Sequence, residues 1–327
     1  MLMYILRRIL LMVPTLIGMT LLLFCVVRFA PGLTTAGGAM AENSRQAQQA
    51  IEEKIKKRLH LDRPLIVQYF LWLNDTVHGN LGESIQYNAP VAQLIKERLP
   101  ITLTLNLLSS IIVYLIAIPG GLLASIRRGK SFDIAWSFVT LALFSLPIIW
   151  VGDMLLAVFG NPNFLGWFPV GGAHATSTEW MTSGSYAGDF LWHMVLPVIC
   201  LSYGQFAYLS KIQRAAMLDN LGLDYVRTAR AKGLPPSVVT LRHVFRNSLL
   251  PMITLFAGLI PGLLGGSVVV EHIFSIKGMG DLVVTATSAR DLPIVQAVAL
   301  IGSIITLICL LITDICYALA DPRVSYD

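Results

Sequence analysis

The sequence predicts an all-α membrane protein with about six transmembrane helices, and three observations support that prediction. Of its 327 residues, 55% are hydrophobic and only 13% are charged, about half the charged fraction of an average soluble domain. The apolar residues gather in runs of about 20 residues, the length that a helix needs to cross a hydrocarbon core. The basic residues fall in short blocks between those runs. This pattern orients membrane spans and differs from the single basic patch of a nucleic-acid-binding protein.

Six apolar segments have the length of a transmembrane helix. In chain order they are residues 9–30, 101–126, 134–160, 190–209, 249–273 and 294–319. A signal peptide is the alternative for the first segment, but its apolar run exceeds the 7–15 residues of a signal-peptide core, so we expect a retained helix. Prolines recur in these segments, namely Pro14, Pro119, Pro147, Pro197, Pro251 and Pro261. Broken helices in lipid need bundle neighbours or a water-filled cavity to satisfy their backbone, which favours a conduit but also fits simple packing kinks.

The basic residues between the spans predict their orientation. Seven Lys or Arg residues lie between the fourth and fifth segments and three between the second and third, whereas 161–189 contains none. Because Lys and Arg accumulate in cytoplasmic connections, the loop 211–246 and both termini are expected to face the cytoplasm. The chain then divides into an N-terminal transmembrane helix (1–30), an external subdomain (31–98), a core transmembrane domain (99–320) and a cytoplasmic tail (321–327).

The predicted external subdomain has helix signals of its own. It contains eight basic and seven acidic residues. These charges do not keep it in the cytoplasm, because the preference of Lys and Arg for the cytoplasmic side applies to short connections, and one of this length can be translocated. We expect one helix at 47–59, with a charged solvated face, and a second at 65–77, with Tyr69, Phe70 and Trp72 on its apolar face. The subdomain either docks a partner or caps a pore.

The most informative stretch is the cytoplasmic connection at residues 224–236. Asp224 is a favoured N-cap residue, and the eight residues after it favour a helix of two turns. Gly233 suits the position just beyond the C-terminus, and Pro235 or Pro236 can open a second helix. The sequence therefore predicts a short helix with defined ends.

This short helix is expected to carry an apolar stripe and a basic face. The stripe consists of Tyr225, Val226 and Ala229. The basic side chains that project elsewhere are those of Arg227, Arg230 and Lys232. Such a helix suits insertion into a partner's groove or attraction to anionic lipid, and the residues alone leave the two nearly even.

A resemblance decides between these alternatives. Residues 224–233, with the run 242–251 that follows them, resemble the coupling loop of binding-protein-dependent ABC importers in its dipeptide and oligopeptide form. The general family reads Glu-Ala-Ala, three residues, then Gly at this place. Counted back from Gly233, this chain reads Arg227, Thr228, Ala229, the substitution typical of peptide permeases.

Other stretches extend the resemblance over nearly the whole chain, and they are similar to the first of the two permeases in such systems. They are residues 4–8, 30–32, 61–64, 68–69, 79–84, 271–275, 278–280, 290–293 and 321–323. Two departures concern the outer face and the substrate. Lys277 stands where the family usually has proline, and residues 161–190 match loosely.

The resemblance implies a type I ABC importer permease bundle in the bacterial inner membrane, with no catalysis of its own. The implied partners are a second permease in a heterodimer, two cytoplasmic ATPases, an extracytoplasmic binding protein, the peptide substrate and membrane lipid. This chain would bind no cofactor, because ATP and magnesium belong to the ATPases. The residues expected to couple to an ATPase are Asp224, Tyr225, Arg227, Thr228, Ala229, Arg230, Lys232 and Gly233. Nickel chelates or another small solute remain alternatives to peptide.

Two rival classes and one isolated acid complete the sequence interpretation. An ion-coupled secondary transporter would need an internal repeat and buried acids near the midplane, and an intramembrane enzyme would need paired catalytic groups. The sequence shows neither a convincing repeat nor such a pair, and its four cysteines and six histidines lack metal-binding spacing.

Asp153 lies in the third segment, where a carboxylate is expected to face the bundle or a cavity. It either makes a structural hydrogen bond or lines the translocation path.

Overall fold

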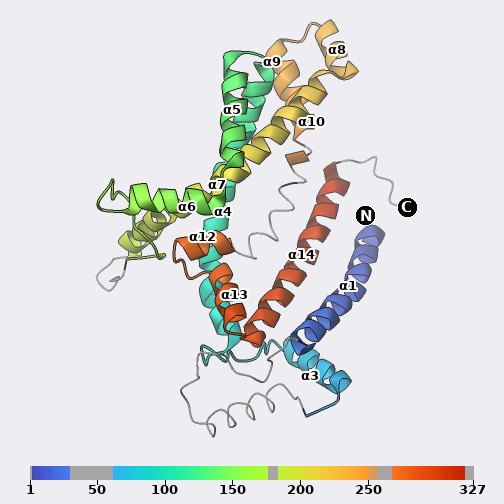
Figure 1. Cartoon of the computed structure of the whole chain (residues 1–327). Coiled ribbons are helices and arrows are strands. Elements are labelled where there is room, and N and C mark those ends of the chain that lie inside the picture. Colours follow the sequence, from blue (N-terminus) through green and yellow to red (C-terminus); the bar gives the residue numbers. More distant parts are fainter. Residues whose placement is uncertain are drawn as a thin grey trace. The chain divides into compact units, whose positions relative to one another are not determined.

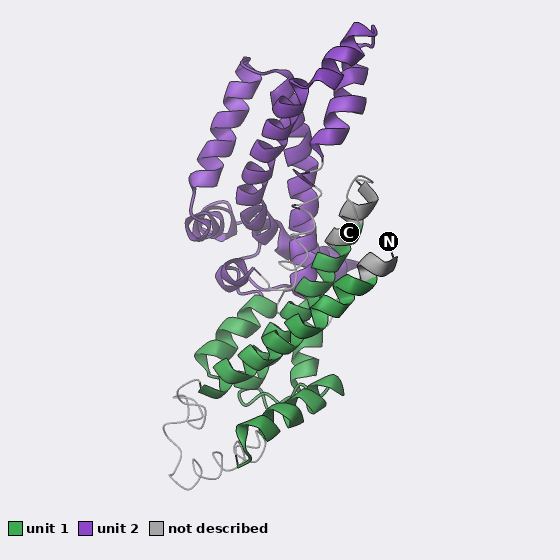
Figure 2. Ribbon diagram, turned by 90° about the vertical axis from the view of Figure 1, so that its right-hand side faces the viewer, with its two compact units in different colours: residues 1–100, 278–327 green, residues 101–277 purple. Residues whose placement is uncertain are grey.

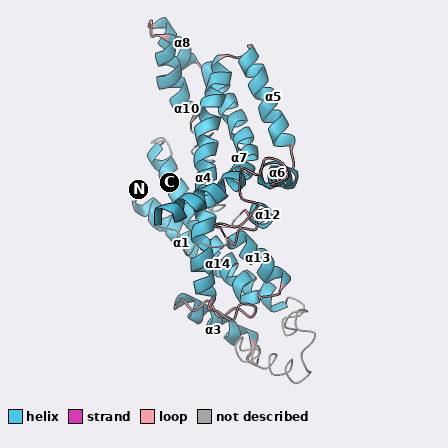
Figure 3. Cartoon of the chain, turned by 90° about the vertical axis from the view of Figure 1, so that its left-hand side faces the viewer, coloured by secondary structure: helices cyan, strands magenta, loops and turns pink. Residues whose placement is uncertain are grey.

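The computed structural model describes residues 2–29, 62–175, 183–249, 251–252, 255 and 267–320, and its regular elements are helices (Figures 1 and 3). A single isolated bridge joins Glu83 and Pro90 within these ranges. The chain forms two compact units, one of residues 1–100 with 278–327 and the other of residues 101–277 (Figure 2).

The first unit joins the two ends of the chain. It contains α1 (Leu2–Phe29), α3 (Leu65–Val77), the start of α4 (Val91–Ile126), α13 (Met279–Ser288) and α14 (Leu292–Ala320). The predicted helix at 65–77 is confirmed at both ends. Its Tyr69 is buried, stacks edge-on against Phe24 of α1, and shares a 3.0 Å hydrogen bond between its hydroxyl and that of Thr20. Phe70, which was expected beside Tyr69 on the apolar face, is exposed. The predicted helix at 47–59 lies outside the described residues.

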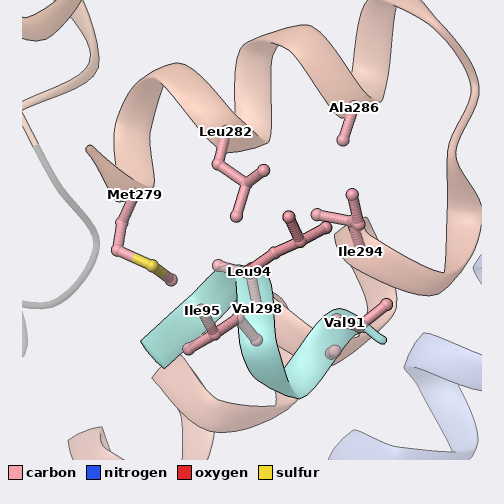
Figure 4. Packing of buried hydrophobic residues seen from close by; sticks show 9 residues of the cluster. Val91, Leu94, Ile95, Met279, Leu282, Ala286, Ile294 and Val298 are labelled. Atoms are coloured by element: carbon pink, nitrogen blue, oxygen red, sulfur yellow. The ribbon is translucent and has the colours of Figure 1, made fainter. Parts of the chain in front are cut away.

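The core of this unit explains where α4 begins. Val91, Leu94 and Ile95 are buried against side chains of α13 and α14 (Figure 4). These three residues recur at helical spacing and face one side, so the helix extends back ten residues before the predicted start at 101. A helix of 36 residues results, longer than a bilayer crossing requires.

The second unit carries the remaining helices. After the rest of α4 come α5 (Ser131–Ser145), α6 (Ile148–Leu155), the π-helix η1 (Leu156–Gly160) and the long α7 (Ser183–Leu221). The chain continues through α8 (Asp224–Ala231), α9 (Pro236–Val238), the π-helix η2 (Val239–Phe245), α10 (Arg246–Ser248) and α12 (Val268–Ile273). Helix α7 packs against both α5 and α6, and it is the element around which this unit is built.

Four of the six predicted spans have a long apolar helix in the described residues. These helices are Leu6–Phe29, Val91–Ile126, Gly184–Leu221 and Leu292–Ile312. The predicted span at 249–273 falls largely outside the described residues and stays a prediction.

The predicted span at 134–160 is not one continuous helix, and it corresponds to a bent pair of helices that can form a fifth span. It consists of two helices, Ser131–Ser145 and Ile148–Gly160, bent by 95° at the break. Leu146 is extended there (φ −79°, ψ 131°), because the ring of Pro147 excludes the helical conformation from the residue before it. Pro147 also lacks the N–H that would continue the ladder of α5. At 15 residues α5 is about 22 Å long, shorter than a hydrocarbon core of about 30 Å.

Two consecutive glycines allow α4 to approach α5 and α7 closely. A Cβ atom on Gly120 would overlap the indole ring of Trp136 of α5. A Cβ atom on Gly121 would lie 2.8 Å from the carbonyl oxygen of Ser210 of α7. Small residues at such positions let helix backbones meet, which is how bundles in lipid gain their packing energy.

Gly120→Ala is therefore expected to destabilise the second unit by about 1–3 kcal/mol, because the added methyl group forces Trp136 out of its place. The measurement is the thermal midpoint of the purified protein in detergent. Gly204→Ala in α7 is the matched control, since a Cβ atom there meets nothing within 4 Å and helix propensity favours alanine by about 0.5–1 kcal/mol. Equal midpoints for the two variants would contradict this account of the packing.

Candidate coupling site

The predicted short helix is present as α8, Asp224–Ala231, but it begins one residue earlier than expected. The N-cap residue is Leu223, with φ −78° and ψ 153°, and Asp224 is the first residue of the helix, so the predicted N-cap is wrong. The cause lies in the preceding turn, where the amides of Gly222 and Leu223 bond back to the carbonyls of Asp219 and Asn220. The chain therefore turns between the end of α7 at Leu221 and Leu223, which becomes the N-cap of α8. Asp224 still places a carboxylate in the first turn, at the positive end of the helix.

The C-terminus of α8 is closed by Gly233, as predicted. Gly233 has φ +76°, a conformation that costs little only for glycine. Its N–H bonds to the carbonyl of Arg230 at 2.9 Å, and the N–H of Leu234 bonds to that of Ala229 at 3.4 Å. These two bonds form a Schellman motif. Pro236 then takes the first position of α9, as the prolines predicted.

The apolar stripe of α8 packs against the chain itself. Val226 is fully buried and Ala229 is 8% exposed. Both belong to a cluster with Met217 of α7 and with Val239 and Val244 of η2. The half-buried Tyr225 donates a 2.9 Å hydrogen bond from its hydroxyl to Oδ1 of Asn220. The stripe therefore fixes α8 on its own unit. We call the surface of α7 and η2 that buries it, formed by Met217, Val239 and Val244, the seat of α8.

The π-helix η2 provides the other part of this seat, and no pattern in the sequence indicated it. Val239 and Val244 are five residues apart, so the i to i+5 repeat of a π-helix brings both to the same side. Both are buried against α8. An α-helical repeat of 3.6 residues would have separated them, which is why a pattern search for α-helix does not find this element.

The opposite face of α8 is exposed and basic. Among the eight residues predicted to couple, six are exposed: Asp224, Arg227, Thr228, Arg230, Lys232 and Gly233. Three of these carry positive charge and one carries negative charge. Arg227 Nη1 lies 3.3 Å from Asp224 Oδ1, an exposed pair three residues apart, and solvent screens such a pair. We call Arg227, Arg230 and Lys232 the basic face.

The structure places Asp153 away from this site. It lies on α6, beyond the bend at the far end of α5 (Figure 1), and it is exposed on the surface of the chain. The exposed residues around it on α6 are large and apolar, namely Ile149, Trp150 and Met154. A carboxylate on such a face requires water or a protein partner if the helix lies at membrane depth.

Two family descriptions and two full-length relatives of the same kind match this chain. Residues 117–326 match the description "Binding-protein-dependent transport system inner membrane component", and residues 1–106 match the N-terminal component of the same systems. The oligopeptide transport system permease protein AppB of Bacillus subtilis is 39% identical over 99% of both chains. The di/tripeptide transport system permease protein DppB of Pseudomonas aeruginosa is 35% identical over the full length of both.

A solved structure shares the fold at low sequence identity. A chain of the MetNI methionine ABC transporter, in an inward-facing conformation, superposes with a TM-score of 0.51 at 15% identity. The match covers 70% of this chain and 97% of the other. At that level of identity, the likeness concerns the architecture alone.

Proposed function

This chain belongs to the family of binding-protein-dependent transport system inner membrane components, and from that premise we propose that it is one of two permease subunits of an ATP-driven peptide importer. The family assignment excludes the ion-coupled carrier and the intramembrane enzyme that the sequence left as rivals. The chain is a transport subunit of the inner membrane and not a catalyst. The substrate is proposed to be di- and oligopeptides, because full-length relatives are permeases of such systems.

The observation that carries the proposal is that α8 has one side buried in its own unit and one side exposed. Its buried side, Val226 and Ala229, fixes the helix on α7 and η2. Its exposed side offers the basic face to a partner. A helix held in this way can move its own unit as a body when a partner displaces it, and a loosely attached helix cannot. This arrangement supports assigning the basic face, with Asp224, Thr228 and Gly233, to contact with a cytoplasmic ATPase.

The seating of α8 changes the role of two residues in the predicted contact set. Ala229 is buried, so its side chain serves the seat rather than the ATPase. Tyr225 is half-buried and bonded to Asn220, which orients its ring at the edge of the surface. The partner's groove is then expected to carry carboxylates that match the basic face.

The proposed assembly has this chain beside a second permease, with two ATPases inside and a binding protein outside. ATP and magnesium act on the ATPases, and their closure shifts the permeases between inward-facing and outward-facing states. Both termini and the loop 211–246 would lie in the cytoplasm, supported by the basic blocks that flank the spans. Residues 31–98 would then lie on the outer side of the membrane.

Asp153 is proposed to lie on the translocation path. Its exposure on an apolar face of α6 supports this, because a carboxylate facing lipid would cost about 2.5–3.5 kcal/mol, whereas one facing a water-filled path would not. There it can accept hydrogen bonds from the amino terminus of a peptide.

The basic face is tested by reversing one charge. Arg227→Glu is expected to lower ATP-dependent peptide uptake by about tenfold or more, because it opposes the partner's carboxylates, while the protein still inserts into the membrane. Uptake is measured in proteoliposomes that contain the complete complex, and ATPase co-purification is measured beside it. Gly233→Pro should have the same effect, because proline has no N–H for the carbonyl of Arg230 and cannot adopt a positive φ.

The matched control for this test is Arg63→Glu. Arg63 is also exposed and also pairs with an aspartate, Asp62, at 3.7 Å, but it lies outside the proposed contact. Normal uptake by Arg227→Glu, or an equal loss in Arg63→Glu, would count against the assignment.

The role of Asp153 is tested with Asp153→Asn and two forms of one peptide. The KM for the peptide with a free amino terminus should rise about tenfold, the value of one lost charge-assisted hydrogen bond. The KM for the N-acetylated peptide should stay unchanged. If the uptake of both peptides falls equally, or the uptake of neither falls, Asp153 does not bind the amino terminus.

A further inference from the structure

An ion pair between α5 and α7 lies close to the seat of α8, and the proposed function has not used it. Arg214 Nε donates to Asp133 Oδ1 at 2.6 Å, and Arg214 Nη2 donates to Asp133 Oδ2 at 2.8 Å. The side chain of Asp133 is 5% exposed and that of Arg214 is 29% exposed. This is the planar, two-bond geometry that makes an Arg–carboxylate pair directional.

The surroundings of Asp133 hold its carboxylate in one orientation. The N–H of Gly129 donates a third hydrogen bond to Oδ2 at 2.9 Å. Gly129 has φ +75°, in the turn that connects α4 with α5. A buried carboxylate with three such donors is fully engaged, whereas removing one partner would leave an uncompensated buried charge. The pair therefore behaves as a fixed joint.

A second contact one turn away makes the joint resistant to rotation. Trp136 Nε1 of α5 donates to Ser210 Oγ of α7 at 2.7 Å. The same ring packs edge-on against Phe206 with centroids 5.5 Å apart. Two connections spaced along both helices fix their relative rotation as well as their distance.

The same turn of α7 connects to the seat of α8. Gln213, the residue before Arg214, donates from Nε2 to Ser248 Oγ of α10 at 3.1 Å. Met217, one turn after Arg214, packs on Val226 and Ala229 of α8. The distance along the helix from Arg214 to Met217 is about 4.5 Å. One turn of α7 therefore holds α5 on one side and α8 on the other.

We propose that Asp133 and Arg214 form a clamp that stays closed throughout the transport cycle and makes α5 move with α7 when an ATPase displaces α8. Both are positioning residues, because among the described residues neither contacts the proposed ATPase face or Asp153. Helix α5 leads through the bend at Pro147 into α6, so a displacement at α8 reaches Asp153 through packed elements of one unit. This inference rests on the proposed function.

The test measures peptide uptake per ATP hydrolysed by the complete complex in proteoliposomes. Asp133→Asn is expected to lower this ratio about tenfold, because the amide has no negative charge and keeps only one acceptor oxygen for Arg214, so the two-bond ion pair is lost, while ATP hydrolysis and ATPase co-purification persist. Arg214→Lys, which keeps the charge but loses the two-bond geometry, should lower the ratio less and serves if Asp133→Asn does not fold. Asp62→Asn, in an exposed ion pair, is the control and should leave the ratio unchanged.

A crosslink separates a closed clamp from a gate that opens. The double variant Asp133→Cys with Arg214→Cys is treated with a short bifunctional thiol reagent. The crosslink should restore at least half of the uptake per ATP that the double variant has lost. The unsubstituted protein, treated with the same reagent, controls for its native cysteines. A crosslinked protein that cannot transport, or Asp133→Asn and Arg214→Lys with the normal ratio, would overturn the clamp. If the unsubstituted complex itself shows no ATP-dependent uptake, the proposed function fails instead.

Discussion

The structure depends on one interaction, the burial of the apolar stripe of α8 against α7 and η2. Val226 and Ala229, two apolar side chains of this short helix, are buried against other residues of the same chain. An isolated helix of eight residues is unstable in water, so this contact, with the Gly233 cap, is what gives α8 a fixed position. The basic face acquires a defined direction only because the opposite face is held.

Other close contacts in the second unit fix its helices relative to one another in the same way. Gly120 and Gly121 let α4 meet α5 and α7 at short range, and the Asp133–Arg214 pair closes the same region by charge. The bend at Pro147 then redirects the chain by 95°. Proline, glycine and one ion pair thus set the geometry of this part of the unit.

The sequence predicted the features that depend on local chemistry. Helix α3 and the Gly233 cap follow from residue spacing and from one conformational preference, and both were found. Pro147 marked a break, but the angle of 95° depends on how α6 packs against α7 and α12. The true start of α4 at Val91 and the π-helix η2 depend on contacts with distant residues. The Asp133–Arg214 pair joins residues 81 positions apart, and the burial of Ala229 depends on the same tertiary packing.

The most direct test of the account is the accessibility of Thr228, an exposed residue of α8. Thr228→Cys is treated with a membrane-impermeant maleimide in intact cells and in inside-out vesicles, with Asp62→Cys as the external reference. We predict labelling at position 228 in inside-out vesicles only, and protection there when the ATPase subunits are bound. Labelling at position 228 in intact cells, or unchanged labelling with the ATPases present, would contradict the central claim that α8 connects this permease to an ATPase in the cytoplasm.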